Sequence, residues 1–114
     1  MSKQSCYEKF LETRQEPVRL AAALEGFFLE EAAPEQKEAY GTYLKKRIRP
    51  AMEVLIEEDD AEKMEQLEQM GWLEGVRIEG FLETARKKKK SASLVWLLRL
   101  KDKKNGYRDR DFTL

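Results

Sequence analysis

The sequence predicts an all-α protein, a single compact bundle of four to six helices with an apolar C-terminal helix at its centre. Apolar residues recur three and four positions apart along every long stretch, and no run of alternating β-branched residues competes with this pattern. At 114 residues, with 41% hydrophobic side chains, the chain has the size and apolar content of one domain. We expect a helical domain over residues 1–104 and a short charged tail over residues 105–114.

The first helix is expected to begin at Ser5. Ser5 and Glu8 have the S-x-x-E spacing in which each side chain binds a free backbone N–H of the first helical turn. A second helix follows at Pro17, because a proline in the first turn sacrifices no hydrogen bond, and its apolar stripe ends near Glu31. The inner faces would carry Cys6, Tyr7, Phe10 and Leu11 in the first helix and Leu20, Leu24, Phe27 and Phe28 in the second.

The segment Ala33-Pro34-Glu35 repeats the same start signal, so a third helix is expected to begin there. Pro50 lies inside its pattern, where the proline ring clashes with the preceding turn and must kink the helix or split it near Arg49. We expect a kink, because the apolar stripe keeps its phase across the proline. Asp59 or Asp60 would then cap the next helix. The stripe consists of Tyr40, Leu44, Ile48, Met52 and Leu55.

Three glycines, Gly71, Gly75 and Gly80, interrupt residues 61–90, and each costs up to about 1 kcal/mol inside a helix. In one interpretation Gly71 ends a short helix and a new one begins at Trp72. In the other, one continuous helix uses Gly71 and Gly75, four residues apart, to admit a close neighbour. The downstream apolar residues cover more than one face, which predicts packing on two sides: Val76, Ile78, Phe81, Leu82 and Ala85.

Ser91 or Ser93 is expected to cap the last helix. Residues 94–98 are all apolar and Leu100 follows, so this helix is apolar nearly all round and should be the most buried element. Asn105 and Gly106, the two residue types that best tolerate a left-handed backbone, should end it.

Charge is distributed unevenly along the chain. The 22 basic and 22 acidic side chains give a formal net charge of zero. Residues 86–114 nevertheless hold 11 basic residues against three acidic ones, so they carry +8 and the rest of the chain carries −8. The protein is therefore polarised, and any electrostatic partner must be recognised locally.

The basic segment is the candidate contact surface for a protein partner or for nucleic acid. Five consecutive cations at a helix end could bind phosphates or an acidic protein surface. In the alternative interpretation, these cations complement the helix dipole and are neutralised by the acidic segments, within the fold or within a dimer. A helix-turn-helix around Gly75 matches poorly, because Glu79 and Glu83 would face phosphates. The candidate contacts are Arg86, Lys87, Lys88, Lys89, Lys90, Lys101 and Lys104.

Catalytic and cofactor chemistry finds little support in the residue types. The chain has no histidine, so the usual general base and zinc ligand are missing, and Cys6 has no histidine to activate it. Acidic residues 57–62 lack the alternation and central glycine of an EF-hand loop. No phosphate-binding loop or dinucleotide motif is present. We therefore expect no enzymatic activity, no catalytic residue, no metal and no cofactor.

Location and function follow from the same features. A single cysteine indicates a reducing compartment, and the longest apolar run, residues 94–98, is far too short to span a bilayer, so we expect a cytoplasmic protein without membrane contact. The leading hypothesis is a non-enzymatic interaction or regulatory module that acts through charged helix faces, as a homodimer or with another protein. The alternative is a nucleic-acid-binding accessory protein. Trp72 is the candidate interface aromatic, with core packing as its other interpretation.

Overall fold

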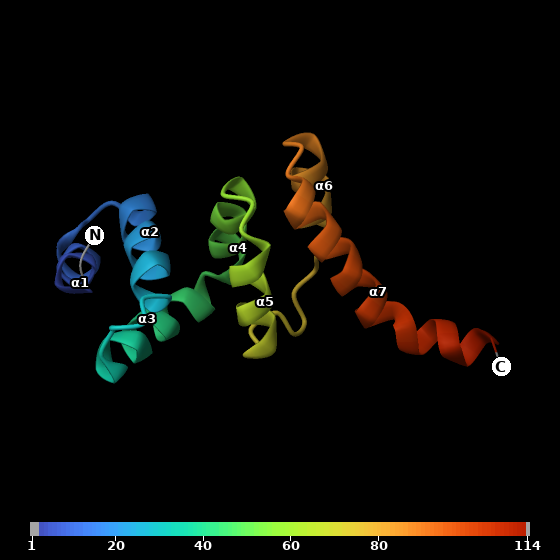
Figure 1. Cartoon of the computed structure of the whole chain (residues 1–114), viewed down its shortest axis with the longest axis horizontal. Coiled ribbons are helices and arrows are strands. Elements are labelled where there is room, and N and C mark those ends of the chain that lie inside the picture. The colour runs from blue at the N-terminus through green and yellow to red at the C-terminus, as the bar shows by residue number, and fades with distance from the viewer. Residues whose placement is uncertain (1–2, 114) are drawn as a thin grey trace. The chain divides into compact units, whose positions relative to one another are not determined.

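The computed structural model describes the backbone of residues 3–113 and the side chains of residues 5–104. Within these residues every regular element is a helix, which confirms the predicted fold class. There are seven helices in residues 3–113, more than the four to six expected, because two predicted long segments are each broken in two. Figure 1 shows α1 (Lys3–Glu12), α2 (Glu16–Phe27), α3 (Pro34–Lys46), α4 (Ile48–Glu57), α5 (Ala61–Gln69), α6 (Glu79–Lys87) and α7 (Ser91–Thr113).

The chain divides into two compact units, unit 1 (Met1–Val54) and unit 2 (Leu55–Leu114). The division falls inside α4, so this helix contributes residues to both units.

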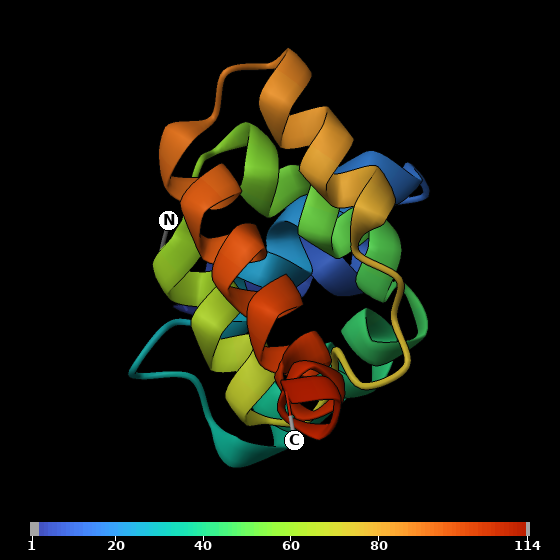
Figure 2. The ribbon, with the colours of Figure 1, turned by 90° about the vertical axis from the view of Figure 1, so that its right-hand side faces the viewer.

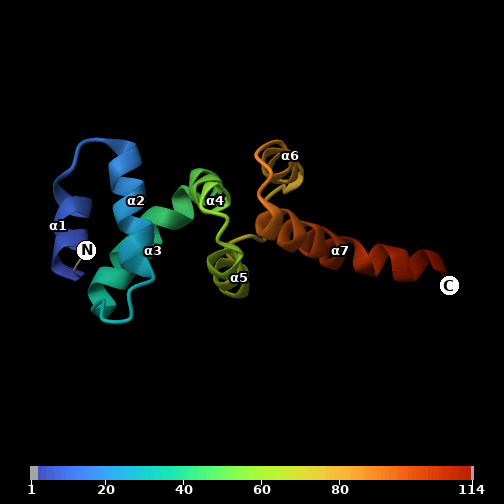
Figure 3. The same ribbon diagram turned by 45° about the horizontal axis from the view of Figure 1, so that its top comes forward.

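Unit 1 is built on α2, which packs against α1 on one side and α3 on the other (Figure 3). Aromatic rings meet edge to face between α1 and α3, with the Phe10 ring centroid 5.0 Å from that of Tyr40 and 5.2 Å from that of Tyr43. Edge-to-face ring pairs stabilise the fold by more than the burial of their apolar surface alone. The core residues of these helices include Cys6, Phe10, Leu20, Leu24, Tyr40, Tyr43 and Leu44.

The first helix starts earlier than predicted. Because α1 already includes Lys3, Ser5 lies inside the helix and not at its cap, so the prediction of a capping box at Ser5 was wrong. Cys6 and Phe10 are buried as predicted, and Tyr7 is half-buried, but Leu11 is 57% exposed. The buried face centres on Cys6 and Phe10, four residues apart, and Leu11 is turned about 100° beyond Phe10.

Both proline start signals are confirmed. Pro17 lies in the first turn of α2 and Pro34 in the first turn of α3, where neither interrupts a helical hydrogen bond. The second helix is shorter than its apolar pattern suggested, since it ends at Phe27 with Phe28 as the C-cap residue, before Glu31.

The third predicted helix is split and not kinked. α3 ends at Lys46, Arg47 is its C-cap residue, and α4 begins at Ile48 with Pro50 in its first turn. Pro50 has no N–H to bond the Lys46 carbonyl, and its ring would clash there, so the chain leaves the helix immediately after Lys46. The apolar stripe continues across this break because α3 buries Tyr40 and Leu44 and α4 buries Met52 and Leu55.

In unit 2, Asp60 caps α5 as predicted, since its carboxylate accepts a hydrogen bond from the Lys63 N–H at 3.1 Å. The first part of the first interpretation of Gly71 is confirmed: with φ of 80° it ends α5 in a left-handed turn. No helix begins at Trp72, however, because α6 begins only at Glu79.

The expectation that α6 packs on two sides was wrong. Val76 and Ile78 precede the helix, and the apolar residues within it, Phe81, Leu82 and Ala85, are all buried on one face. The sequence pattern suggested a second apolar face because it counted Val76 and Ile78 as part of the helix.

α6 and α7 run antiparallel on either side of a tight turn (Figure 2), and α7 also packs against α5. α7 is not the most buried element, because Val95 is 55% and Leu98 42% exposed. Nor does it end at Asn105 and Gly106, since it continues to Thr113. The cost of one glycine in a helix, about 1 kcal/mol, does not by itself end a helix.

Gly26 permits the close approach of α2 and α3. A methyl group at this position would overlap the ring of the buried Tyr40. We therefore predict that Gly26→Ala destabilises the protein by about 1–3 kcal/mol, as overpacking does, although alanine is the better helix former. Chemical denaturation followed by far-ultraviolet circular dichroism measures the change.

The exposed Ala21 of the same helix supplies the control. Ala21→Gly should cost only its helix propensity, about 1 kcal/mol. A gain in stability from Gly26→Ala would contradict the close contact.

Candidate functional site

The predicted contact segment forms the basic turn, residues 86–90, between α6 and α7. The Lys89 N–H binds the Arg86 carbonyl at 3.2 Å and the Lys90 N–H binds the Ala85 carbonyl at 2.9 Å. These two bonds, with Lys89 in the left-handed region at a φ of 58°, form a Schellman motif that closes α6.

An acidic turn, residues 57–60, closes α4 in the same way. The Asp59 N–H binds the Ile56 carbonyl and the Asp60 N–H binds the Leu55 carbonyl, both at 2.9 Å, and Asp59 has a φ of 55°. α4 and α6 thus both end in left-handed turns that are not built on glycine.

The two turns bind one another. The Lys88 ammonium lies 2.5 Å from a carboxylate oxygen of Glu57. The Asp59 carboxylate accepts the backbone N–H of Ser93 at 2.7 Å and that of Ala92 at 3.3 Å. Asp59 therefore caps α7, so the prediction that Ser91 or Ser93 does so was wrong: the free N–H groups of this helix are bound by a residue more than 30 positions earlier in the chain.

These contacts lower the pKa of both carboxylates, Glu57 and Asp59. The hydrogen bond from Lys88, with its charge and then that of Lys90, lowers the pKa of Glu57. The hydroxyl and N–H of Ser93, followed by the Ala92 N–H and the Lys90 charge, lower the pKa of Asp59. The Ser93 hydroxyl lies close enough to act on Asp59 but lacks the geometry of a hydrogen bond.

The other predicted contact residues divide into two groups. Lys104 donates to the carbonyls of Leu73 and Val76, at 3.1 and 3.0 Å, and so holds the chain between α5 and α6. Lys87 lies 3.7 Å from Glu83, one helical turn away on the exposed side of α6. The second group consists of exposed cations that bind no side chain among those described: Arg86, Lys89 and Lys101.

The segregation of charge lies within unit 2. Unit 1 contains nine basic and nine acidic residues, and unit 2 contains 13 of each. Residues 55–85 carry −8 and residues 86–114 carry +8. The two oppositely charged halves belong to one folded unit, and α7 adds a further pair, Lys103 with Glu68 at 3.0 Å.

Trp72 is half-buried in the turn that follows α5, where its backbone N–H donates to the Leu67 carbonyl at 3.2 Å. The second tryptophan, Trp96, is buried and donates its indole N–H to Glu65 at 2.8 Å. This bond joins α7 to α5.

An apolar patch that the sequence analysis missed lies on the outer face of α7, formed by Leu94, Val95 and Leu98. Val95 and Leu98 are exposed and Leu94 is half-buried, whereas Trp96, Leu97 and Leu100 are buried on the opposite side. The all-round apolar run concealed this patch, because periodicity alone cannot tell which side of such a helix is covered.

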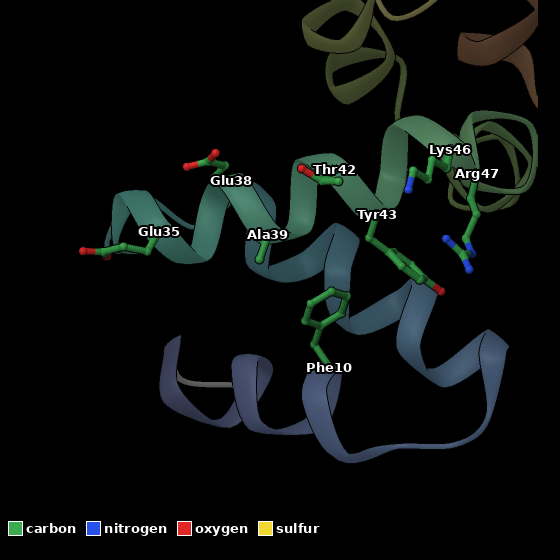
Figure 4. Close-up of a pocket in the computed structure, with 8 residues that line it drawn as sticks. All are labelled: Phe10, Glu35, Glu38, Ala39, Thr42, Tyr43, Lys46 and Arg47. Carbon is green, nitrogen blue, oxygen red and sulfur yellow. The ribbon is translucent and has the colours of Figure 1, made fainter.

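In unit 1, α3 and α1 border an open surface hollow of about 590 Å³ (Figure 4). Glu35 and Glu38 lie toward one end of it and Lys46 and Arg47 toward the other. Between them the hollow is lined by Ala39, Thr42, Tyr43 and Phe10.

A network beside the hollow fixes Tyr43 and Arg47. Glu16 accepts the Tyr43 hydroxyl at 2.8 Å and the Arg47 Nε–H at 2.9 Å, and the Arg47 guanidinium lies 4.1 Å from the Tyr43 ring centroid. The Tyr43 hydrogen bond and then Arg47 lower the pKa of Glu16. Burial and then the Glu16 hydrogen bond raise the pKa of Tyr43 to about 12.

Cys6 is fully buried, and this burial, with the charge of Glu25, raises the pKa of its thiol, which disfavours the reactive thiolate. Among the described residues, no three His, Cys, Asp or Glu side chains gather as metal ligands would. None of the helices within the described part of the chain combines the length and the apolar character that a bilayer crossing requires.

Comparison of the chain with known protein families, with curated proteins and with solved structures finds no match.

The left-handed conformation of Lys89 predicts an unusual gain. Lys89→Gly should stabilise unit 2 by up to about 1 kcal/mol, because glycine adopts this conformation without steric cost. Lys87→Gly, in the last turn of α6, should instead destabilise it by about 1 kcal/mol. Both tryptophans lie in unit 2, so tryptophan fluorescence during urea unfolding reads both changes. Equal losses in the two variants would show that Lys89 is not left-handed.

The cap on α7 predicts a pH dependence. Because the folded protein lowers the pKa of Asp59, its carboxylate stabilises unit 2 above about pH 4, and this contribution is lost as the pH falls through the folded-state pKa. Asp59→Asn keeps an acceptor that tolerates the left-handed turn but removes the charge. The variant should have a lower urea midpoint at pH 7, and the difference should shrink as the pH falls below about 4. A difference that stays constant from pH 2 to pH 7 would contradict the assignment.

Proposed function

We propose that this protein is a non-enzymatic interaction module that binds a protein partner through the outer face of α7. The observation that carries the proposal is the pair of exposed apolar side chains one turn apart, Val95 at 55% and Leu98 at 42% exposure. Together with Leu94 they form a contiguous stripe on a helix whose other side is already packed. Stripes of this kind receive an amphipathic helix of a partner.

The charges beside the stripe indicate the partner's chemistry. Helical geometry puts Arg99 and Lys101 on opposite sides of the stripe, and each is exposed and bound to no described side chain. A partner helix with apolar residues at the centre and carboxylates on both flanks is complementary to this arrangement.

The basic turn is the weaker candidate for a binding surface. Lys88 already binds Glu57, and the charge of Lys90 lowers the pKa of both Glu57 and Asp59. Six acidic residues lie in the acidic turn and on α6, so carboxylates would repel a nucleic-acid phosphate that approached Arg86 and Lys89, the two cations of the turn that bind no described side chain. We therefore favour a protein partner.

The test uses a fluorescein-labelled amphipathic peptide, with leucines spaced three and four residues apart and glutamates on both flanks, and fluorescence anisotropy as the readout. The wild-type protein should bind it more tightly than a scrambled peptide of the same composition. Two double variants, Val95→Gln with Leu98→Gln and Arg99→Glu with Lys101→Glu, should each weaken binding about tenfold, the loss of ~1.4 kcal/mol.

A matched control removes two exposed cations that lie outside the stripe. Arg86→Gln with Lys89→Gln should leave peptide affinity unchanged. Equal binding of both peptides, or no effect of the α7 variants, would contradict the proposal. Binding of a labelled oligonucleotide at ~50 mM salt, lost in the Arg86 and Lys89 variant, would favour nucleic acid instead.

A further inference from the structure

The outer side of α3, in unit 1, carries its acidic residues at one end and its basic residues at the other. Its inner side is occupied by buried Tyr40, Tyr43 and Leu44. The opposite side begins with two carboxylates and ends with two ammonium groups, and the side chains between them are small. In chain order this outer side carries Glu35, Glu38, Ala39, Thr42, Lys45 and Lys46, all exposed except the half-buried Ala39.

Three of the charges on this side are available for a partner. Glu35, Glu38 and Lys46 form no ion pair or hydrogen bond with any side chain that the structure describes. They line the surface hollow, with the carboxylates toward one end and Lys46 toward the other (Figure 4). These three charges are therefore not compensated by any described side chain of their own fold.

From these features we propose that α3 pairs antiparallel with α3 of a second copy of this chain. In an antiparallel pair related by a two-fold axis between Ala39 and Thr42, Glu35 of each copy faces Lys46 of the other. Within one copy Glu35 and Lys46 are eleven positions apart, which spans about 16 Å of helix, so the favourable contacts lie at both ends of the interface. A parallel pair would oppose Glu35 to Glu35 and is disfavoured.

The centre of the surface suits close approach. Ala39 and Thr42 are small, so two helices can approach to about 8 Å between axes, the short end of the usual range. The hollow provides apolar lining from Phe10 and Tyr43. Glu16 holds both Tyr43 and Arg47 in place, so this lining is rigid before the second copy arrives.

The strength of the pair follows from its size. One helix of 13 residues against another buries less than the ~1,200 Å² at the lower end of stable interfaces, so the dimer should be weak and concentration-dependent. Its charges are at the surface, so salt should weaken it further.

The experiment is sedimentation velocity of the full chain from about 10 to 500 µM in 50 and 500 mM NaCl. The wild-type protein should dimerise at high concentration and low salt, and at least tenfold less tightly at high salt. Two charge-reversal variants, Glu35→Lys with Glu38→Lys and Lys45→Glu with Lys46→Glu, should each remain monomeric. An equimolar mixture of the two should form a heterodimer, because an outer side of α3 with four basic residues then faces one with four acidic residues.

Controls separate this surface from the others. Glu12→Lys with Glu53→Lys reverses two exposed carboxylates of the same unit outside the hollow and should dimerise as the wild type does. Val95→Gln with Leu98→Gln should also dimerise normally. A wild-type monomer at 500 µM in 50 mM NaCl overturns the inference, and so does a dimer that both α3 reversals retain or that the α7 variant abolishes. Circular dichroism verifies that each variant is folded.

Discussion

The attraction between the two oppositely charged halves of unit 2 is the constraint on which this part of the structure depends. Residues 55–85 carry −8 and residues 86–114 carry +8, and neither half could collapse by itself without strong self-repulsion. Asp59 and Lys88 lie where the halves meet. One carboxylate caps α7 and one ammonium group compensates Glu57, so the start of α7 is tied to the end of α4.

This arrangement changes the functional meaning of the basic run. Five consecutive cations resemble a phosphate-binding segment, yet the structure uses Lys88 and Lys90 beside the acidic turn and leaves Arg86 and Lys89 exposed without a described partner. Two further surfaces are available. One is the apolar outer face of α7 in unit 2, and the other is the side of α3 in unit 1 whose charges run from acidic to basic.

Signals that act within one helical turn could be predicted from the sequence. Pro17, Pro34, Asp60 and Gly71 mark helix ends correctly, because the chemistry of each involves atoms no more than five residues away. The Asp59 cap, by contrast, joins residues more than 30 positions apart. A left-handed lysine breaks a local preference, and the exposure of Val95 depends on which side of α7 its neighbours cover. These features follow from tertiary structure, which a single sequence does not encode locally.

The central claim is that the charges of unit 2 compensate one another inside the fold, and salt tests it by the sign of its effect. Screening weakens attraction between opposite charges and repulsion between like charges alike. Urea unfolding of the full chain, followed by tryptophan fluorescence, would be measured in 20 mM and in 500 mM NaCl. Compensation predicts a lower unfolding midpoint in 500 mM NaCl. A higher midpoint would mean that the cations of residues 86–90 mainly repel one another, and would contradict the account.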